Sequence, residues 1–159
     1  MLSFVRGCDI MLFISVKDFR NMKYTQIIDS FKGENRWLSN FWIYDLIKQL
    51  SVEHHYQAAK TTNLDDWMLV MSCEKPADTK RLFKGVESGG RALAVRPDWD
   101  SIKFTLMEQF VREKFATNHE LRQKLIDTRG TLLIEGNTWG DTVWGVCGGV
   151  GENNLAKIS

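Results

Sequence analysis

Three polar side chains recur at helical spacing after Ser51. Glu53, Gln57 and Lys60 lie at positions i, i+4 and i+7, so a helix would align a carboxylate, an amide and an amine along one edge. The apolar residues at the same spacing predict its buried stripe: Val52, Tyr56 and Ala59. The polar row is either a solvated flank with a Glu–Lys pair or an edge facing a cleft, where partial burial would tune the carboxyl group.

A tryptophan opens a second predicted helix. Pro97 and Asp98 give a start signal for a helix over 98–116, and Trp99 falls in its first turn. An indole there either packs into the core or forms a wall on which a base or sugar stacks. The spacing predicts that this helix buries Ile102, Leu106 and Phe110.

A glycine-rich segment, 135–154, precedes a last short helix expected from about Glu152. Its backbone amides could cradle a phosphate beside the helix N-terminus, although the GxGxxG fingerprint is absent. The segment also brings two carboxylates and two indoles: Glu135, Asp141, Trp139 and Trp144. Such a set suits a nucleotide-sugar pocket, but a glycine-rich turn around buried tryptophans would look the same.

Metal and cofactor chemistry find little support. The adjacent His54 and His55 would point about 100° apart on a helix, which disfavours shared ligation of one ion. The three cysteines are far apart and contain no CxxC pair: Cys8, Cys73 and Cys147. We therefore expect no metal, no cofactor and no disulfide framework, and a reducing compartment.

Composition points to one folded domain. The chain has 159 residues, of which 43% are hydrophobic and 26% charged, with 21 basic against 20 acidic side chains. These values exclude a disordered protein, and they exclude a strong overall positive potential that would attract nucleic acid. A local basic patch at Lys80, Arg81 and Lys84 could still contact phosphate. The longest apolar run, 10–16, is far shorter than the ~20 residues of a membrane span. We expect a cytoplasmic protein with no membrane contact and no signal peptide.

The elements that must position these groups are mostly helical. Residues 1–21 are either an extra strand or an N-terminal extension, and we expect an extension because Met22 would make a plausible start of a domain over 22–159. The pattern predicts strands at 24–29 and 131–135, an ordered loop at 31–41, and either one strand or a hairpin turning near Asp45 at 42–50. It predicts helices at 52–61, at 64–74, after Pro76 and at 98–116. A further predicted helix begins at a capping box over 117–120 and runs through Ile126. The fold class is α+β, predominantly helical with a small β-sheet.

The ordered set of motifs resembles the NADAR/YbiA-like family over about residues 24–158. The matching positions are Phe31-x-Gly33, Leu38-Ser39-Asn40-Phe41, Glu53-His54-x-Tyr56-Gln57-Ala58-x-Lys60, Arg96-x-Asp98-Trp99-Asp100 with Lys103 and Met107, Lys114-Phe115 with Asn118, Leu121 and Leu125, and then Thr128, Leu133, Glu135, Asp141, Trp144-Gly145 and Gly151-x-Asn153-x-Leu155. One departure is Ala156, where the family usually has Gly.

The resemblance implies an α+β, YbiA-like domain with N-glycosidase activity. Similar members split phosphoribosylamino-pyrimidine intermediates of riboflavin biosynthesis, and others remove ADP-ribose from guanine in nucleic acid. The implied catalytic residues are Glu53, Trp99 and Asp141. The implied substrate-binding residues are Arg36, Ser39, Asn40, Phe41, Lys60, Trp144, Gly145, Gly151 and Asn153. The alternative to an enzyme is a binding module, which would hold ADP-ribose or a nucleotide without cleaving it.

The implied reaction passes through an oxocarbenium-like sugar. We expect Glu53 to activate water and stabilise the cation, Asp141 to orient ribose hydroxyls or share acid–base duty, and Trp99 to stack on the base. In a second route, a neutral Lys60 attacks the anomeric carbon and forms a Schiff base.

Overall fold

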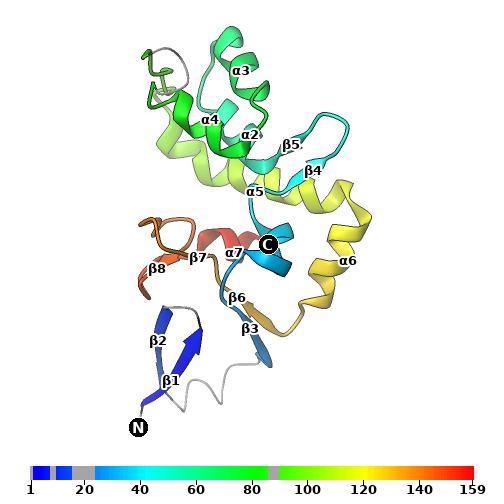
Figure 1. Cartoon of the computed structure of the whole chain (residues 1–159), viewed down its shortest axis with the longest axis vertical. Helices are drawn as coiled ribbons and strands as arrows, with labels where there is room; N and C mark the ends of the chain where they lie inside the picture. Colours follow the sequence, from blue (N-terminus) through cyan, green and yellow to red (C-terminus); the bar gives the residue numbers. More distant parts are fainter. Residues whose placement is uncertain (1, 8–9, 16–23, 86–89) are drawn as a thin grey trace. The chain divides into compact units, whose positions relative to one another are not determined.

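The computed structural model describes residues 2–7, 10–15, 24–85 and 90–159. It comprises two compact units (Figure 1). We call Met1–Ser39 with Glu120–Ser159 the terminal unit, and Asn40–His119 the central unit. The predicted α+β class is confirmed, because helices of five to 19 residues accompany strands of two to six residues.

The central unit begins with a hairpin of β4 (Ile43–Asp45) and antiparallel β5 (Leu50–Ser51). The Asp45 carboxylate accepts hydrogen bonds from the backbone N–H groups of Ile47 at 3.2 Å and Lys48 at 3.0 Å. This side chain therefore holds the turn, as asparagine and aspartate commonly do. Of the two alternatives for 42–50, the hairpin near Asp45 is confirmed.

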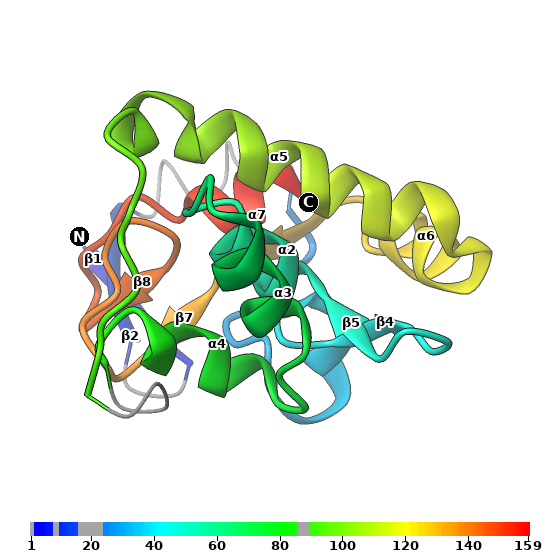
Figure 2. The ribbon, with the colours of Figure 1, turned by 90° about the horizontal axis from the view of Figure 1, so that it is seen from above.

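Four helices follow: α2 (Val52–Ala58), α3 (Leu64–Met71), α4 (Pro76–Leu82) and α5 (Trp99–Thr117). Figure 2 shows α2 between α5 and the pair formed by α3 and α4, and α2 contacts all three. A core cluster joins α2, α3 and α4 to the segment that precedes α5, through Ala58, Val70, Leu82 and Leu93. Helix α2 is thus the central element, which explains why even its polar side chains are buried.

Two expectations about these helices are corrected. The fully buried residues of α5 are Met107, Val111, Lys114 and Phe115, whereas the predicted Ile102, Leu106 and Phe110 are only half-buried. The two rows lie about one residue, or 100°, apart on the helix, which hydrophobic spacing alone did not resolve. Thr117 ends α5, and its hydroxyl donates to the Glu113 carbonyl at 2.7 Å. It therefore does not cap α6 (His119–Asp127).

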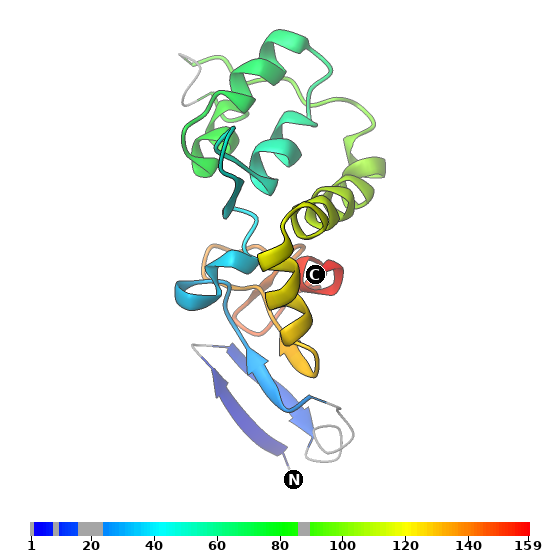
Figure 3. The same cartoon turned by 90° about the vertical axis from the view of Figure 1, so that its right-hand side faces the viewer.

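The terminal unit contains three pairs of short strands. Strands β1 (Leu2–Gly7) and β2 (Ile10–Ser15) form an antiparallel hairpin, while β3 (Gln26–Ile28) and β6 (Thr131–Leu133) are parallel neighbours (Figure 3). The third pair, β7 (Gly136–Asn137) and β8 (Val146–Cys147), is also parallel. The hairpin lies within the predicted 1–21 extension, of which residues 1, 8–9 and 16–21 lie outside the described residues.

A small core holds the terminal strands together. It consists of Ile134 and Val146 with Ile27 and Leu132 packed against them. A 3-10 helix, η1 (Gly33–Leu38), replaces the loop predicted at 31–41, and α7 (Asn154–Ile158) is the expected last helix. None of the helices that the structure describes has the length and apolar character needed to cross a membrane.

Candidate active site

Glu53 is a buried carboxylate with two polar neighbours. It is 2% exposed, and its Oε1 accepts a hydrogen bond from Gln57 Nε2 at 2.8 Å. Lys80 Nζ, from α4, lies 3.4 Å from the same oxygen. A buried charge requires such partners, since an isolated carboxylate would be strongly destabilised away from water. The edge of α2 that carries Glu53 is therefore not a solvated flank.

The amide of Gln57 is only partly satisfied. Its side chain is 1% exposed, and its Oε1 accepts no hydrogen bond from any residue in the described part of the chain. A buried acceptor without a partner costs about 1–3 kcal/mol of stability. Such an atom in a folded protein calls for an explanation, and one frequent explanation is a functional contact.

Lys60 lies in the turn after α2, inside a group of aromatic rings. Its Nζ lies 5.7 Å from the ring centroids of Tyr56 and Trp99 and 5.3 Å from that of Phe83. Burial lowers the pKa of this amine; the Glu53 charge opposes the shift and the Lys80 charge adds to it. A larger neutral fraction makes an amine a better nucleophile.

Trp99 is placed by main-chain hydrogen bonds. The Arg96 N–H donates to the Lys60 carbonyl at 2.7 Å, and the Trp99 N–H donates to the Arg96 carbonyl at 3.2 Å. The indole meets the ring of Tyr56 edge-on, with centroids 4.9 Å apart. The first turn of α5 is thus tied to the end of α2, and the half-buried indole lies beside the Lys60 amine.

Asn40 and Phe41 complete the central group. Asn40 is buried; its carbonyl accepts from the Glu53 N–H at 3.0 Å, and its amide donates to Met107 Sδ at 3.3 Å. The ring of Phe41 lies 5.3 Å from Lys80 Nζ. The structure therefore brings together five of the predicted site residues: Asn40, Phe41, Glu53, Lys60 and Trp99.

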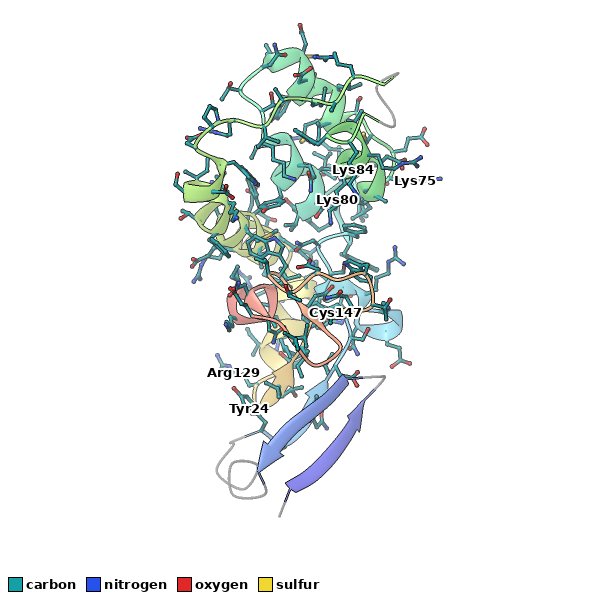
Figure 4. All side chains as sticks on the ribbon, turned by 90° about the vertical axis from the view of Figure 1, so that its left-hand side faces the viewer. Tyr24, Lys75, Lys80, Lys84, Arg129 and Cys147 are labelled. Carbon is teal, nitrogen blue, oxygen red and sulfur yellow. The ribbon has the colours of Figure 1, made fainter. Side chains whose placement is uncertain are left out.

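Sequence reasoning missed the partnership of Lys80 with Glu53. Lys80 was expected only as part of a surface patch, and its side chain is indeed 47% exposed. Figure 4 shows Lys80 with Lys75 and Lys84 along α4 and its two ends. The burial of Glu53 implies a nearby cation, but nothing in the sequence says which of these lysines supplies it.

The two adjacent histidines have packing roles. His54 is fully buried, and its Nδ1 accepts a hydrogen bond from the Ser51 N–H at 3.2 Å. We therefore assign the ring proton to Nε2, which lies 2.9 Å from the Cys73 carbonyl oxygen. Burial lowers the pKa of His55, whose ring lies 5.5 Å from that of Phe110. Throughout the residues described, no group of three or more His, Cys, Asp or Glu side chains could hold a metal ion.

Asp141, in the terminal unit, organises its own loop. Its Oδ1 accepts hydrogen bonds from the N–H groups of Val143 at 3.1 Å and Trp144 at 2.9 Å. Asn137 reinforces the turn: its Oδ1 accepts from the Asp141 N–H at 3.0 Å, and its Nδ2 donates to the Asp141 carbonyl at 2.7 Å. One carboxylate oxygen of the half-buried Asp141 therefore holds the segment that carries Trp144.

The glycine-rich segment is closely packed against itself. A Cβ at Gly145 would overlap the Glu135 carbonyl oxygen, and one at Gly151 would overlap the Gly145 carbonyl oxygen. Asn153 links the segment to β6, because its Oδ1 accepts from the Glu135 N–H at 2.9 Å and its Nδ2 donates to the Leu133 carbonyl at 3.0 Å. The absence of side chains at these two glycines thus permits close approach of the backbone.

The backbone amides at the start of α7 have partners within the glycine-rich segment. The backbone N–H groups of residues 152–155 donate to carbonyls of residues 142–145. These hydrogen bonds fix the start of α7 against the loop, and a phosphate cradle formed by other amides of the glycine-rich segment stays a prediction. A direct contact of Gly145, Gly151 or Asn153 with substrate stays a prediction.

The remaining predicted residues lie in the terminal unit. Arg36 is exposed on η1, and its carbonyl accepts from the Ser39 N–H at 3.0 Å. The predicted site residues of this unit are Arg36, Ser39, Asp141, Trp144, Gly145, Gly151 and Asn153. The convergence of Asp141 with Glu53 and Trp99 stays a prediction, because these residues belong to different units.

Comparison with known proteins gives a consistent family. A family model described as NADAR domain matches residues 17–158. An N-glycosidase of Nostoc punctiforme is 34% identical over 109 residues, which cover 67% of each chain. The N-glycosidase YbiA of Escherichia coli is 31% identical over 107 residues, 67% of this chain and 63% of that one.

Two further matches extend this similarity. A riboflavin biosynthesis protein of Vibrio vulnificus is 35% identical over 109 residues, which cover 68% of this chain but 28% of that protein. The solved NMR structure of Escherichia coli YbiA superposes with a TM-score of 0.68 at 28% identity, covering 85% of this chain and 81% of that one. The chain therefore spans only part of the curated relatives that it matches.

Proposed function

This chain belongs to the NADAR domain family, and from that premise we propose that it is an N-glycosidase that hydrolyses the bond between a phosphorylated ribose and a base. The names of the Nostoc and Escherichia relatives support the reaction class. The name of the Vibrio relative supports a link to riboflavin biosynthesis, and we propose a phosphoribosylamino-pyrimidine intermediate of that pathway as the substrate. Such a substrate also suits a cytoplasmic protein with a net charge of only +1.

The observation that carries this proposal is the buried Glu53 carboxylate, whose charge acts on the Lys60 amine, which in turn lies 5.7 Å from the centroid of the Trp99 ring. Cleavage of a ribosyl C–N bond develops positive charge at the anomeric carbon. A carboxylate held away from water stabilises that charge more strongly than a solvated one, because the effective dielectric constant is lower. Gln57 and Lys80 hold this carboxylate from one side, through Oε1.

In the proposed reaction, a water oxygen attacks the anomeric carbon while the C–N bond breaks. The electron pair of that bond goes to the departing nitrogen, which gains a proton, and Glu53 accepts a proton from the attacking water. Asp141 orients the ribose hydroxyls or supplies the proton, and Trp99 stacks on the base and excludes water. The products are the phosphorylated ribose and the free amine of the base.

The substrate contacts that we propose are the residues that the family resemblance implies. They are Arg36, Ser39, Asn40, Phe41, Lys60, Trp144, Gly145, Gly151 and Asn153. In the central unit, Asn40, Phe41 and Lys60 lie on elements that also carry or contact Glu53 and Trp99. Arg36 would supply a guanidinium to the phosphate from the exposed face of η1.

The lowered pKa of Lys60 favours a second route to the same products. The neutral amine attacks the anomeric carbon and the base departs with the C–N electron pair. The sugar ring then opens to a Schiff base, which water hydrolyses to release the sugar and restore the amine. Borohydride would reduce the Schiff base to a stable adduct on Lys60, whereas direct attack by water leaves nothing to trap.

The test is to incubate the purified protein with the phosphoribosylamino-pyrimidine and, separately, with ADP-ribosylated DNA. We expect release of ribose 5-phosphate from the first substrate, and a decrease of roughly 10²–10⁴-fold in kcat for Glu53→Gln. The exposed Glu74 provides the matched control Glu74→Gln. Cleavage of the DNA substrate alone would make the protein an ADP-ribosyl glycohydrolase, and tight ADP-ribose binding without any release would make it a binding module.

A further inference from the structure

The unpartnered oxygen of Gln57 lies next to the proposed catalytic carboxylate. Gln57 follows Glu53 by four residues, so both side chains project from the same face of α2. Gln57 Nε2 donates to Glu53 Oε1 at 2.8 Å, and Gln57 Oε1 is buried with no hydrogen-bond partner among the residues described. We propose that this oxygen binds the attacking water and makes Gln57 a positioning residue for hydrolysis.

The orientation of the amide follows from the chemistry of the pair. A carboxylate accepts hydrogen bonds and an amide nitrogen donates them, so the nitrogen must face Glu53. The opposite orientation would place two acceptors against each other. Gln57 Oε1 is therefore left as an acceptor, and what it lacks is a donor. Water, with two O–H groups, is a donor of this kind.

The contacts of Glu53 fit a water shared by the two side chains. Lys80 Nζ and Gln57 Nε2 both contact Oε1 of Glu53, so Oε2 can accept a hydrogen bond from the same water that donates to Gln57 Oε1. One O–H then points to each side chain, and a lone pair of the water oxygen is left for the anomeric carbon. Because both acceptors belong to one helix, their separation is fixed by α2.

This inference rests on the proposed N-glycosidase function, and the reaction remains the one written above. The water oxygen forms the new bond to the anomeric carbon as the C–N bond breaks, and Glu53 receives the proton. Gln57 exchanges no proton; it only fixes the direction of the lone pair. Loss of such orientation costs up to about 10²-fold in rate.

Methanol provides a test that separates orientation from folding. Methanol has a single O–H group, so it can donate to only one of the two acceptors, and the wild-type protein should prefer water. With Gln57→Met, which has a similar length but no amide, that preference should weaken. Products are measured in a fixed methanol–water mixture as the ratio of the methyl riboside phosphate to ribose 5-phosphate. The ratio does not depend on how much of the protein is folded.

We expect Gln57→Met to lower kcat by roughly 10-fold to 10²-fold, to change KM little, and to raise the methyl riboside ratio. Gln109→Met, on the exposed face of α5, is the matched control and should leave both values unchanged. If Gln57→Met fails to fold, Gln57→Asn keeps both polar groups but withdraws them by one methylene, and should raise the ratio in the same direction.

Two results would overturn the inference. An unchanged product ratio in the Gln57 variants would mean that the amide does not hold the water. A higher KM at unchanged kcat would mean that Gln57 contacts the substrate instead. Failure of the underlying function would look different, because the wild-type protein itself would then release no sugar phosphate from any of the substrates tested.

Discussion

Lys80 Nζ lies 3.4 Å from Oε1 of Glu53, although nearly half of the lysine side chain is exposed and the carboxylate is buried. A cation from α4 thus reaches a carboxylate of α2, which we propose to be the catalytic one. The ring of Phe41 lies 5.3 Å from the same ammonium group and lines its path. The charge at the site therefore depends on two helices that are separate in the sequence.

This ion pair predicts a specific coupling between two substitutions. Lys80→Met should lower kcat/KM by roughly tenfold, since Glu53 loses its cation, and it should have little further effect when Glu53 is already Gln. A double-mutant cycle of kcat/KM for the single and double variants measures this coupling. Lys75→Met, at the exposed N-terminal end of α4, is the control. Additive losses would show that the pair does not act as a unit.

The lowered pKa of Lys60 predicts how stability responds to alkaline pH. Burial makes the folded state bind the proton of this amine less tightly than the unfolded state does, which is the reverse of a salt-bridged lysine. The free energy of unfolding should therefore rise as the pH increases from below the folded pKa towards the ordinary lysine value of 10.5.

Lys60→Met removes this proton and should flatten that part of the profile. Urea titrations of both proteins between about pH 8 and pH 10 give the comparison. Lys103→Met, which removes the half-buried partner of the exposed Asp100 on α5, serves as the control. A difference between wild type and Lys60→Met that stays constant over this range would contradict the assignment.

His54 is predicted to be structural. Its ring is fully buried and both nitrogens have partners, in Ser51 and Cys73. His54→Ala should lower the free energy of unfolding by about 2–4 kcal/mol, because it leaves a cavity and removes the hydrogen bonds of the ring to Ser51 and Cys73. The exposed His119→Ala should change it by less than about 0.5 kcal/mol. Chemical denaturation measures both, and comparable losses would contradict the assigned role.

Close packing predicts that two glycines differ in how well they tolerate alanine. Gly151 and Gly140 both have positive φ, at 153° and 84°, so alanine is strained at either position. Only at Gly151 would the added Cβ also overlap a backbone atom, the Gly145 carbonyl oxygen. Gly151→Ala should therefore lower the free energy of unfolding by about 1–3 kcal/mol more than Gly140→Ala. Equal losses, measured by urea titration, would contradict this packing.

The elements of the fold could be predicted from local patterns because their signals are local. Asp45 marks the turn of the hairpin, Ser51 precedes α2, and Pro76 opens α4, each through chemistry that acts within a few residues. The buried face of α5 could not be predicted with equal success. Its rows differ by only 100°, and the neighbouring elements determine which one is covered.

The candidate site, too, could be predicted only in its local part. The spacing of Glu53 and Gln57 places both on one face of a helix, and the structure bears this out with a direct hydrogen bond. The contacts of Lys80 with Glu53 and of Lys60 with Phe83 depend on how α4 and its following loop pack against α2. No pattern in the sequence encodes such contacts between distant segments.

The hydrogen bond from the Arg96 N–H to the Lys60 carbonyl has a consequence for mutational tolerance. The Arg96 side chain donates to the Asp98 carboxylate at 2.6 Å and 2.9 Å, but the link to the end of α2 is made by the main chain and needs only an amide hydrogen at position 96. In a saturation library, proline should be the substitution at this position that is selected against most strongly, since it alone removes that donor.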